Sequence, residues 1–411
     1  MPYTFTTEVT AEETEEFLFS LPHYNVMQSP AWAQVKPDWS SVLCGVRDGN
    51  GKLCGSALVL IRKLPLGFKI AYSPRGFVAD YSDEELVSVF TAGLRAYCKK
   101  IGAYVLRIDP EIRIGSIYKG EKTENAEGLG QLEALKKEGF LHMGFATDFN
   151  TYTQPRFNAE YSLRAADGTA LTDEEILGGF DKKPVRTEIG QHTRRASFVH
   201  FEKRGIFFEA NLSENAVEEF VRISEHTEQR QHILLRDAEY FTRMKKAFGD
   251  DLVIMFAKMD LDRFEKFLDS QPDDEQTRAD RAEAKRLRAE KGNIVDMSAV
   301  LFLKSRDTAY LMYSGFDDSV FPRFRTTNQI RFEAMRRFRD EGLSTFSFMG
   351  IHGDLNDTLS EFKLKFNPVV VEFAGEFEMP VRPLTYKFMA KAFPKAKKLY
   401  IGLMLRLKGK K

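Results

Sequence analysis

The sequence predicts a mixed α/β fold made of two related modules, and the main observation behind this is an internal repeat. Residues 56–76 and 298–315 both consist of an apolar strand, a short turn and a second strand that ends in Tyr-Ser or Tyr-Ser-Gly. Each copy is followed by a helical segment that ends near a glycine, residues 86–102 and 328–343, and then by another apolar strand. An internal repeat indicates that one structural unit occurs more than once, and two copies are too few for a solenoid. We therefore expect a pair of α/β modules that face each other.

Composition sets the size and the charge of the expected protein. The chain has 411 residues, which indicates two or three domains, and 43% of them are hydrophobic, as in ordinary globular proteins. Lys+Arg and Asp+Glu both total 60, so the formal charge is zero. A protein that coats nucleic acid would be basic. Any contact with nucleic acid must therefore be local.

Cysteine usage and the length of the apolar runs indicate a cytoplasmic protein. The three cysteines, Cys44, Cys54 and Cys98, form no CxxC pair, and so sparse and odd a set is typical of a reducing compartment. The N-terminal segment is acidic and has no apolar signal-peptide core. No run reaches the ~18–20 apolar residues that a membrane span needs.

The first module is expected to begin with two short helices. Residues 11–21 have helical character, and Ser29-Pro30 is typical of a helix start, with Ser as the N-cap and Pro at the first helical position. Trp32 and Lys36 then stand four residues apart, on one helical face. The sequence alone favours a surface lysine stacked beside a partly buried tryptophan. Strands are expected to follow at residues 41–47 and 53–62.

Charged residues at the end of the next strand identify a candidate cleft. This strand ends with Arg107 and Asp109 just before Pro110, and the helix that precedes it is expected to have a capping box of Ser82 and Glu85. A charged pair at the carboxyl end of a strand is well placed to line a cleft. An exposed, salt-bridged loop would give the same pattern, and both interpretations stay open.

Three segments of the chain depart from ordinary globular composition. Residues 182–204 are locally basic, and a helix carrying Arg194 and Arg195 could contact phosphates, although a solvated helix face is the commoner cause. Residues 260–292 are rich in charge and Ala with few core-forming residues, which predicts an antiparallel helical hairpin inserted before the second repeat. The basic, amphipathic tail, residues 387–411, suits an anionic membrane surface, and equally a helix docked on the body with its lysines outward.

Motifs of covalent and metal catalysis are absent from the sequence. It contains no G-x-S-x-G nucleophile elbow, no P-loop, no HExxH motif and no G-x-G-x-x-G loop. The seven histidines are scattered along the chain. We therefore expect no covalent nucleophile, no metal and no cofactor.

Several segments, taken in order, resemble one known family. QSPAWAQVK (28–36), LPLGFKIAYSPRGFVADY (64–81), RIDP (107–110), LMYSG (311–315) and EFKLKF (361–366) follow the order of the FemABX family of peptidoglycan-bridge aminoacyltransferases, and the LPLGF…SPRG…DY wording is most similar to its MurM/MurN branch. The resemblance implies two tandem acetyltransferase-like (GNAT-like) subdomains with an inserted antiparallel helical hairpin. The implied boundaries are 1–153 for the first subdomain, 154–259 and 293–386 for the second, 260–292 for the hairpin arm and 387–411 for the tail.

The resemblance also implies an activity. The protein would add Ala, Ser or Gly from aminoacyl-tRNA to the stem-peptide amine of lipid II, a membrane-bound precursor. No enzyme nucleophile is needed, because the donor ester is already activated and the acceptor amine attacks it. The implied partners are aminoacyl-tRNA, lipid II, the inner membrane leaflet through the basic C-terminal tail and, as the resemblance allows, a partner transferase. The protein would then be cytoplasmic and peripherally associated with the membrane.

Two other functions stay open at this stage. One is a coenzyme A-dependent N-acyltransferase, since the expected fold is shared with that superfamily. The sequence lacks an R/Q-x-x-G-x-G/A loop for the coenzyme A pyrophosphate, so the fold could be shared while the donor is not. The other is a non-catalytic protein that binds a membrane surface.

Individual residues take their expected roles from the matching motifs. Lys363 in EFKLKF matches a lysine close to the donor ester, where its charge would stabilise the developing oxyanion. Asp109 matches an acid near the acceptor peptide that would orient the amine or take its proton. The implied substrate-binding residues are Lys36, Trp32, Arg230 and Tyr313, with Lys36 and Arg230 on the precursor's pyrophosphate, and the implied tRNA-binding residues are Arg194, Arg195 and Lys203.

The sequence departs from the family pattern at one turn. Phe366 is followed by Asn367, where the family often has glycine. Asparagine also tolerates the left-handed backbone conformation. We therefore expect the turn to be kept.

Overall fold

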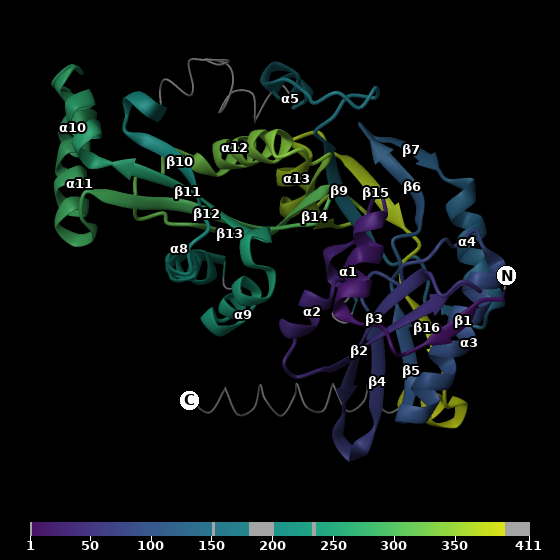
Figure 1. Ribbon diagram of the computed structural model, residues 1–411. Helices are drawn as coiled ribbons and strands as arrows, with labels where there is room; N and C mark the ends of the chain where they lie inside the picture. Colours follow the sequence, from purple (N-terminus) through teal and green to yellow (C-terminus); the bar gives the residue numbers. More distant parts are fainter. Residues whose placement is uncertain (1, 150–152, 181–200, 232–235, 391–411) are drawn as a thin grey trace.

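The framework of the protein is a pair of β-sheets, one of seven strands and one of nine. The computed structural model describes residues 2–149, 153–180, 201–231 and 236–390 (Figure 1). The seven-stranded sheet lies at the end that carries the N-terminus, and the long strands of the nine-stranded sheet run away from it toward a pair of helices at the opposite end (Figure 1).

The first sheet has the strand order β1-β2-β3-β4-β5-β16-β8. Neighbouring strands are antiparallel except β4 and β5, which are parallel. Because a parallel pair needs a long crossover, helix α3 (Glu84–Ile101) connects these two strands. The strands are β1 (Thr4–Thr6), β2 (Ser40–Arg47), β3 (Leu53–Lys63), β4 (Lys69–Ser73), β5 (Ala103–Ile108), β8 (Leu141–His142) and β16 (Phe377–Pro380).

The second sheet has the order β10-β11-β12-β13-β14-β9-β15-β6-β7. Its one parallel pair is β13 and β14, and the connection between them contains helix α12 (Thr326–Asp340). The strands are β6 (Arg113–Tyr118), β7 (Glu121–Glu124), β9 (Phe157–Ser162), β10 (Ile206–Asn211), β11 (Leu252–Asp260), β12 (Ile294–Lys304), β13 (Thr308–Phe316), β14 (Thr345–Ile351) and β15 (Val369–Phe373).

The two sheets contain the same unit, which confirms the internal repeat. In each sheet three consecutive antiparallel strands, β2-β3-β4 or β11-β12-β13, precede a helix, and the strand after the helix is parallel to the third. In the second unit, β13 and β14 pair only between residues 308–310 and 345–347. The two strands then separate, and this leaves an opening in the second module.

The cap of the first repeat helix differs from the sequence-based expectation. The side chain of Asp83 accepts a hydrogen bond from the backbone N–H of Leu86 and caps α3. The prediction of a capping box on Ser82 was therefore wrong by one residue, because an aspartate next to it takes the N-cap place.

The predicted helical hairpin is present and projects from the body. Helices α10 (Leu261–Asp269) and α11 (Glu275–Lys291) lie side by side at the far end of strands β11 and β12 (Figure 1). The Arg288 guanidinium lies 2.9 Å from the Glu265 carboxylate and links them. The other helices are α1 (Ala11–Ser20), η1 (Val26–Gln28), α2 (Pro30–Gln34), η2 (Pro65–Gly67), α4 (Ala126–Lys137), α5 (Asp173–Gly179), α8 (Asn215–Gln231), α9 (Ala238–Phe248), η3 (Gly249–Asp251) and α13 (Thr358–Leu364).

The two modules share an apolar core and exchange strands. One core combines buried Met27 and Leu58 of the first module with Phe220 and Phe241 of the second. Strands β6 and β7 come early in the sequence but complete the second sheet, and β16, near the other end, completes the first. The domain boundaries predicted from the sequence stay a proposal. The two sheets do not follow these boundaries, because β6, β7 and β16 each belong to the sheet of the other module.

Truncating a side chain in the shared core tests how strongly it joins the modules. Phe220 is fully buried there, so we expect Phe220→Ala to lower the free energy of unfolding by about 3–5 kcal/mol. Urea unfolding followed by circular dichroism measures this. Leu129→Ala, on the exposed side of α4, is the control and should change it by less than about 0.5 kcal/mol. Equal effects of the two changes would contradict the role given to this core.

Candidate active site

A cavity of about 1170 Å³ lies between the two modules. Helix α2 and strands β3, β4 and β5 of the first module form one wall, and helices α8 and α9 of the second form the other. Tyr386, Met389 and Ala390, close to the end of the described chain, line one side. The volume of the cavity exceeds the ~300–1,000 Å³ of usual small-molecule pockets. The cavity can therefore take an extended ligand that contacts both modules.

Lys36 is held on the cavity wall by two aromatic rings. Helix α2 begins at Pro30 with Ser29 at the N-cap position, as the sequence predicts. The Lys36 Nζ atom lies 5.1 Å from the ring centroid of Trp32 and 5.3 Å from that of Tyr240. The predicted stacking of Trp32 and Lys36 is confirmed, and both residues line the cavity. Burial, with a smaller contribution from Arg236, lowers the pKa of Lys36 to about 8.

Two further cations face the same cavity in the same way. The guanidinium of Arg62 lies 5.6 Å from the ring centroid of Trp39, and that of Arg236 lies 5.3 Å from the ring centroid of Tyr240. Within the described part of the chain, neither these two nor Lys36 has a carboxylate at ion-pair distance, in contrast to Arg107, which is 2.6 Å from Glu378. Three cations without counter-charge, each on an aromatic face, suit a ligand with several negative charges.

Asp109 lies behind the cavity wall rather than on it. Its carboxylate is 2% exposed and accepts hydrogen bonds from the Tyr72 hydroxyl at 2.7 Å and from the backbone N–H groups of Arg75 and Gln154, both at 2.6 Å. Burial raises the pKa of Asp109, and these donors and the Arg75 charge oppose the shift. Tyr72, Gln154 and Arg107 line the cavity. Asp109 thus fixes the Tyr72 side chain and the backbone at Gln154, and its catalytic role stays a prediction.

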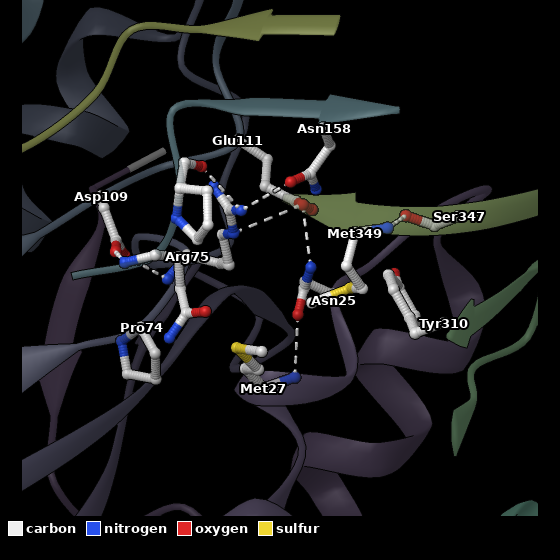
Figure 2. Close-up of polar contacts among 12 residues, drawn as sticks. Asn25, Met27, Pro74, Arg75, Asp109, Glu111, Asn158, Tyr310, Ser347 and Met349 are labelled. Atoms are coloured by element: carbon white, nitrogen blue, oxygen red, sulfur yellow. Dashed lines mark hydrogen bonds and ion pairs between the residues drawn. The ribbon is translucent and has the colours of Figure 1, made fainter. Parts of the chain in front are cut away.

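A buried polar cluster joins the modules next to this wall (Figure 2). Arg75 has a left-handed backbone with a φ of 60°, and its guanidinium donates to the Pro155 carbonyl at 3.0 Å and lies 3.8 Å from the Glu111 carboxylate. Glu111 also accepts a hydrogen bond from the Asn25 side-chain amide at 2.8 Å. Figure 2 shows Asn158 on the same side of the Arg75 guanidinium as Glu111. The guanidinium also donates to the side-chain oxygen of Asn158 at 3.4 Å.

His23 extends this cluster into the second module. Its ring nitrogens lie 3.2 Å from Glu111 and 2.9 Å from Asp307, which belongs to the turn between β12 and β13. Burial alone would lower the pKa of His23, but the two carboxylates raise it to about 10. Burial would raise the pKa of Glu111, and His23 lowers it to about 2. The imidazolium therefore acts as a charged clamp between the modules.

Lys363 lies in the second module, away from the residues that line the large cavity. Its Nζ donates to the Gly350 carbonyl at 2.5 Å, and burial together with the Arg331 charge lowers its pKa to about 7. Arg331 and the neighbouring Phe362 line a second cavity of about 140 Å³. Gly315 lines it as well and lies beyond the last paired residue of β13 and β14. Lys363 thus contacts β14 beyond the residues at which that strand pairs with β13.

The remaining predicted residues have different positions. The Tyr313 ring packs 4.9 Å from Phe241 and 6.3 Å from Tyr240, so it supports the cavity wall from behind. Lys203 is exposed near the start of β10. Arg230 lies in α8, but its side chain is outside the described part, and Arg194 and Arg195 are outside the described residues. The turn at Asn367 is kept, with a left-handed φ of 52°.

Sequence reasoning missed several residues of the site. Arg62 and Tyr72 are in the repeated strands, where they appeared as ordinary strand residues, and Arg236 stood among other helical charges. Their convergence on one cavity depends on contacts between distant segments. The LPLGF resemblance beside Arg62 was the one local signal that could have identified it.

One group of described residues could hold a metal by its ligand types. His226, Asp317 and Asp318 bring their ligand atoms within 4.8 Å of one another. The Lys291 ammonium already lies 2.5 Å from Asp317 and supplies a counter-charge. Nothing in this geometry requires a metal ion.

Comparison with known proteins identifies the family. The model of the FemAB family matches residues 9–286 and 269–393, and the chain belongs to this family. It is 24% identical to a lipid II:glycine glycyltransferase of Staphylococcus epidermidis over 98% of this chain and 99% of that protein. It is 25% identical to aminoacyltransferase FemA of Staphylococcus aureus over 92% and 96%, respectively.

A solved structure confirms the fold. The crystal structure of FemX superposes on this chain with a TM-score of 0.76 at 22% sequence identity, covering 95% of this chain and 100% of FemX. The predicted α/β architecture of two repeated modules with an inserted helical hairpin is thereby confirmed, and the likeness of each module to acetyltransferases stays a prediction.

The His23 clamp gives the stability of the protein a defined pH dependence. The contribution of His23 is complete below its ordinary pKa of 6.5 and is lost as the pH rises toward about 10. The contribution of Glu111 is complete above 4.5 and is lost as the pH falls toward about 2. We expect His23→Gln to lower the thermal unfolding midpoint at pH 6 and to lower it much less at pH 10. A difference from wild type that is equal at the two pH values would contradict the clamp.

Proposed function

We propose that this chain, an aminoacyltransferase of the FemAB family, transfers an amino acid from aminoacyl-tRNA to the stem-peptide amine of lipid II during synthesis of the peptidoglycan bridge. The donor is Ala, Ser or Gly, and the likeness to the MurM/MurN branch stays a prediction. The observation that carries this proposal is the set of three uncompensated cations in the cavity between the modules.

The pyrophosphate of lipid II fits this set of cations. Burial depresses the pKa of Lys36 because its ammonium has lost water without gaining an anion. A bound phosphate would restore that balance and form charge-assisted hydrogen bonds with Lys36, Arg62 and Arg236. The aromatic rings beneath them keep the cations in place before the ligand arrives.

The acceptor peptide would extend along the wall that Asp109 holds. Tyr72 and Gln154 line the cavity, and the Asp109 carboxylate holds them from behind by accepting hydrogen bonds from the Tyr72 hydroxyl and the Gln154 backbone N–H. Such a fixed wall suits the binding of a peptide backbone, which needs both donors and acceptors. We assign Asp109 to positioning this wall around the attacking amine.

The donor ester would enter the second module at the opening between β13 and β14. The amine nitrogen attacks the ester carbon, the carbon–oxygen bond to the tRNA ribose breaks, and the proton of the amine ends on the ribose hydroxyl. The Lys363 ammonium stabilises the negative charge that develops on the carbonyl oxygen. Its pKa of about 7 also allows the amine form to relay the proton at neutral pH.

Removing cavity cations tests the acceptor site. We expect Lys36→Ala and Arg236→Ala each to weaken binding of purified lipid II by about 10- to 100-fold, since a hydrogen bond to a charged group contributes about 1.5–3 kcal/mol. Arg243→Ala is the matched control, because Arg243 also lines the cavity but is paired with Glu239 at 2.5 Å. Equal losses in all three variants, measured by titration in detergent, would remove the specific role of the two cations.

Removing Lys363 tests the chemistry. We expect Lys363→Met to reduce single-turnover transfer from labelled Ala-, Ser- or Gly-tRNA to lipid II by at least about 10²-fold, with lipid II binding unchanged. Lys365→Met, two residues along and half-buried, is the matched control and should keep wild-type transfer. Wild-type turnover by Lys363→Met would exclude it from the mechanism. Absence of transfer by the wild-type protein with all three donors would exclude the proposed reaction.

The basic C-terminal tail completes the proposal. Residues 391–411 are outside the described structure, and we infer from their alternating basic and apolar residues that they bind the inner membrane leaflet. The protein would then be cytoplasmic and peripherally attached to the membrane that presents lipid II.

A further inference from the structure

The three most exposed large apolar side chains of the described residues gather at one end of the first module. They are Leu66, which is 92% exposed, Leu384 at 86% and Phe388 at 59%. Leu66 is at the tip of the β3–β4 hairpin, and the other two are in the helical segment before residue 390. Figure 1 shows the hairpin and this segment at the lower end of the molecule. Exposed apolar residues that cluster in this way mark an interaction surface.

These segments are held together as one surface. Leu64 and Phe68 of the hairpin pack with Tyr386 and Met389 of the helical segment in a small apolar cluster around Tyr104. The end of α3 is attached to the same surface: the Lys69 ammonium donates to the Ile101 carbonyl at 2.9 Å. The apolar tips therefore project from a folded base.

The backbone at Leu66 shows that its exposure is built into the turn. Leu66 has a φ of 64° and a ψ of 17°, in the left-handed region that normally favours glycine or asparagine. A leucine here combines an unfavourable backbone conformation with an apolar side chain in water. Strain of this kind is typical of residues kept for a function.

Cations surround the apolar tips. The segments 60–70, 96–102 and 381–390 contain no Asp or Glu. Exposed lysines and arginines come from all three segments, and within the described part of the chain none of them has an ion-pair partner. They are Lys63, Lys99, Lys100, Arg382 and Lys387.

We propose that this surface, which we call the docking face, inserts Leu66, Leu384 and Phe388 into an anionic lipid bilayer. Apolar tips within a basic rim complement an interface of acyl chains beneath negative headgroups. None of the helices in the described ranges is long and apolar enough to cross a membrane, so this attachment is peripheral. A protein partner would require a complementary acidic surface and is an outcome that the test below distinguishes.

The docking face borders the large cavity, which gives it a role in the proposed reaction. Leu64, Tyr386 and Met389 belong both to its base and to the cavity lining. A bilayer bound here would bring the headgroup region to the mouth of the cavity. A lipid-linked pyrophosphate could then reach Lys36 while its lipid stays in the membrane. This role rests on the proposed function, whereas the docking itself does not.

Vesicle sedimentation tests the docking face without any substrate. The full chain is mixed with phosphatidylcholine vesicles with and without phosphatidylglycerol. We expect binding only when phosphatidylglycerol is present, weakened by salt, and reduced about tenfold or more by Leu66→Glu and by the double change Leu384→Glu with Phe388→Glu. Leu129→Glu in α4, an exposed leucine outside this surface, is the control and should bind like wild type.

Other outcomes would overturn the proposal. Wild-type binding by Leu66→Glu together with loss on truncation after residue 390 would assign all attachment to the tail. If the wild type bound neither kind of vesicle, lipid docking would be wrong, and a protein partner would be the alternative occupant of the docking face.

Transfer assays separate this inference from the proposed function. Leu66→Glu should keep wild-type transfer to a short-chain, water-soluble lipid II analogue and lose about tenfold with lipid II in vesicles. Equal transfer to vesicle-bound lipid II by Leu66→Glu and wild type would contradict the role of the face. If the wild type transferred to neither acceptor, the proposed function would fail while sedimentation still decided the docking.

Discussion

The shared apolar core between the two modules is the constraint on which the rest of the structure depends. Trp32 and Phe241 belong to this core and also line the cavity. Side chains that hold the modules together therefore also line the cavity. Any change in the angle between the modules would change the shape of the cavity. Close-packed interiors transmit such displacements because they contain few voids. Within the described part of the chain, the packing of the two modules therefore defines the cavity.

Ion pairs reinforce this packing at one edge of the cavity. At another edge a positive charge has no counter-charge in the described part of the chain. Around Arg75, Glu111 and His23, opposite charges alternate and each finds a partner. Around Lys36, buried positive charge has aromatic rings in place of anions. Uncompensated charge reduces stability, and at Lys36 this charge lies on the cavity wall, where a ligand could supply the anion.

Local features of the fold were predictable from sequence, and features that need distant contacts were not. The repeat and the hairpin arm depend on sequence periodicity and composition, and the contact of Lys36 with Trp32 depends on residues four apart, although α2 ends at Gln34. The position of Asp109 shows the limit: the end of β5 places it at the carboxyl edge of the sheet, but which side it faces depends on Tyr72 and Gln154, from other segments. Arg236 contacts Tyr240 locally and reaches Lys36 only through the packing of α9 against α2.

The position of β16 has a consequence for how the protein is made. This strand pairs with β5 inside the first sheet, although more than half of the chain lies between them in sequence. During synthesis the N-terminal module emerges from the ribosome with β5 unpaired on one side until residues 377–380 arrive, after the entire second module. Contacts so distant in sequence slow folding and leave a strand edge exposed to aggregation. The first module therefore becomes complete only when the second one already is, and the two mature as a unit.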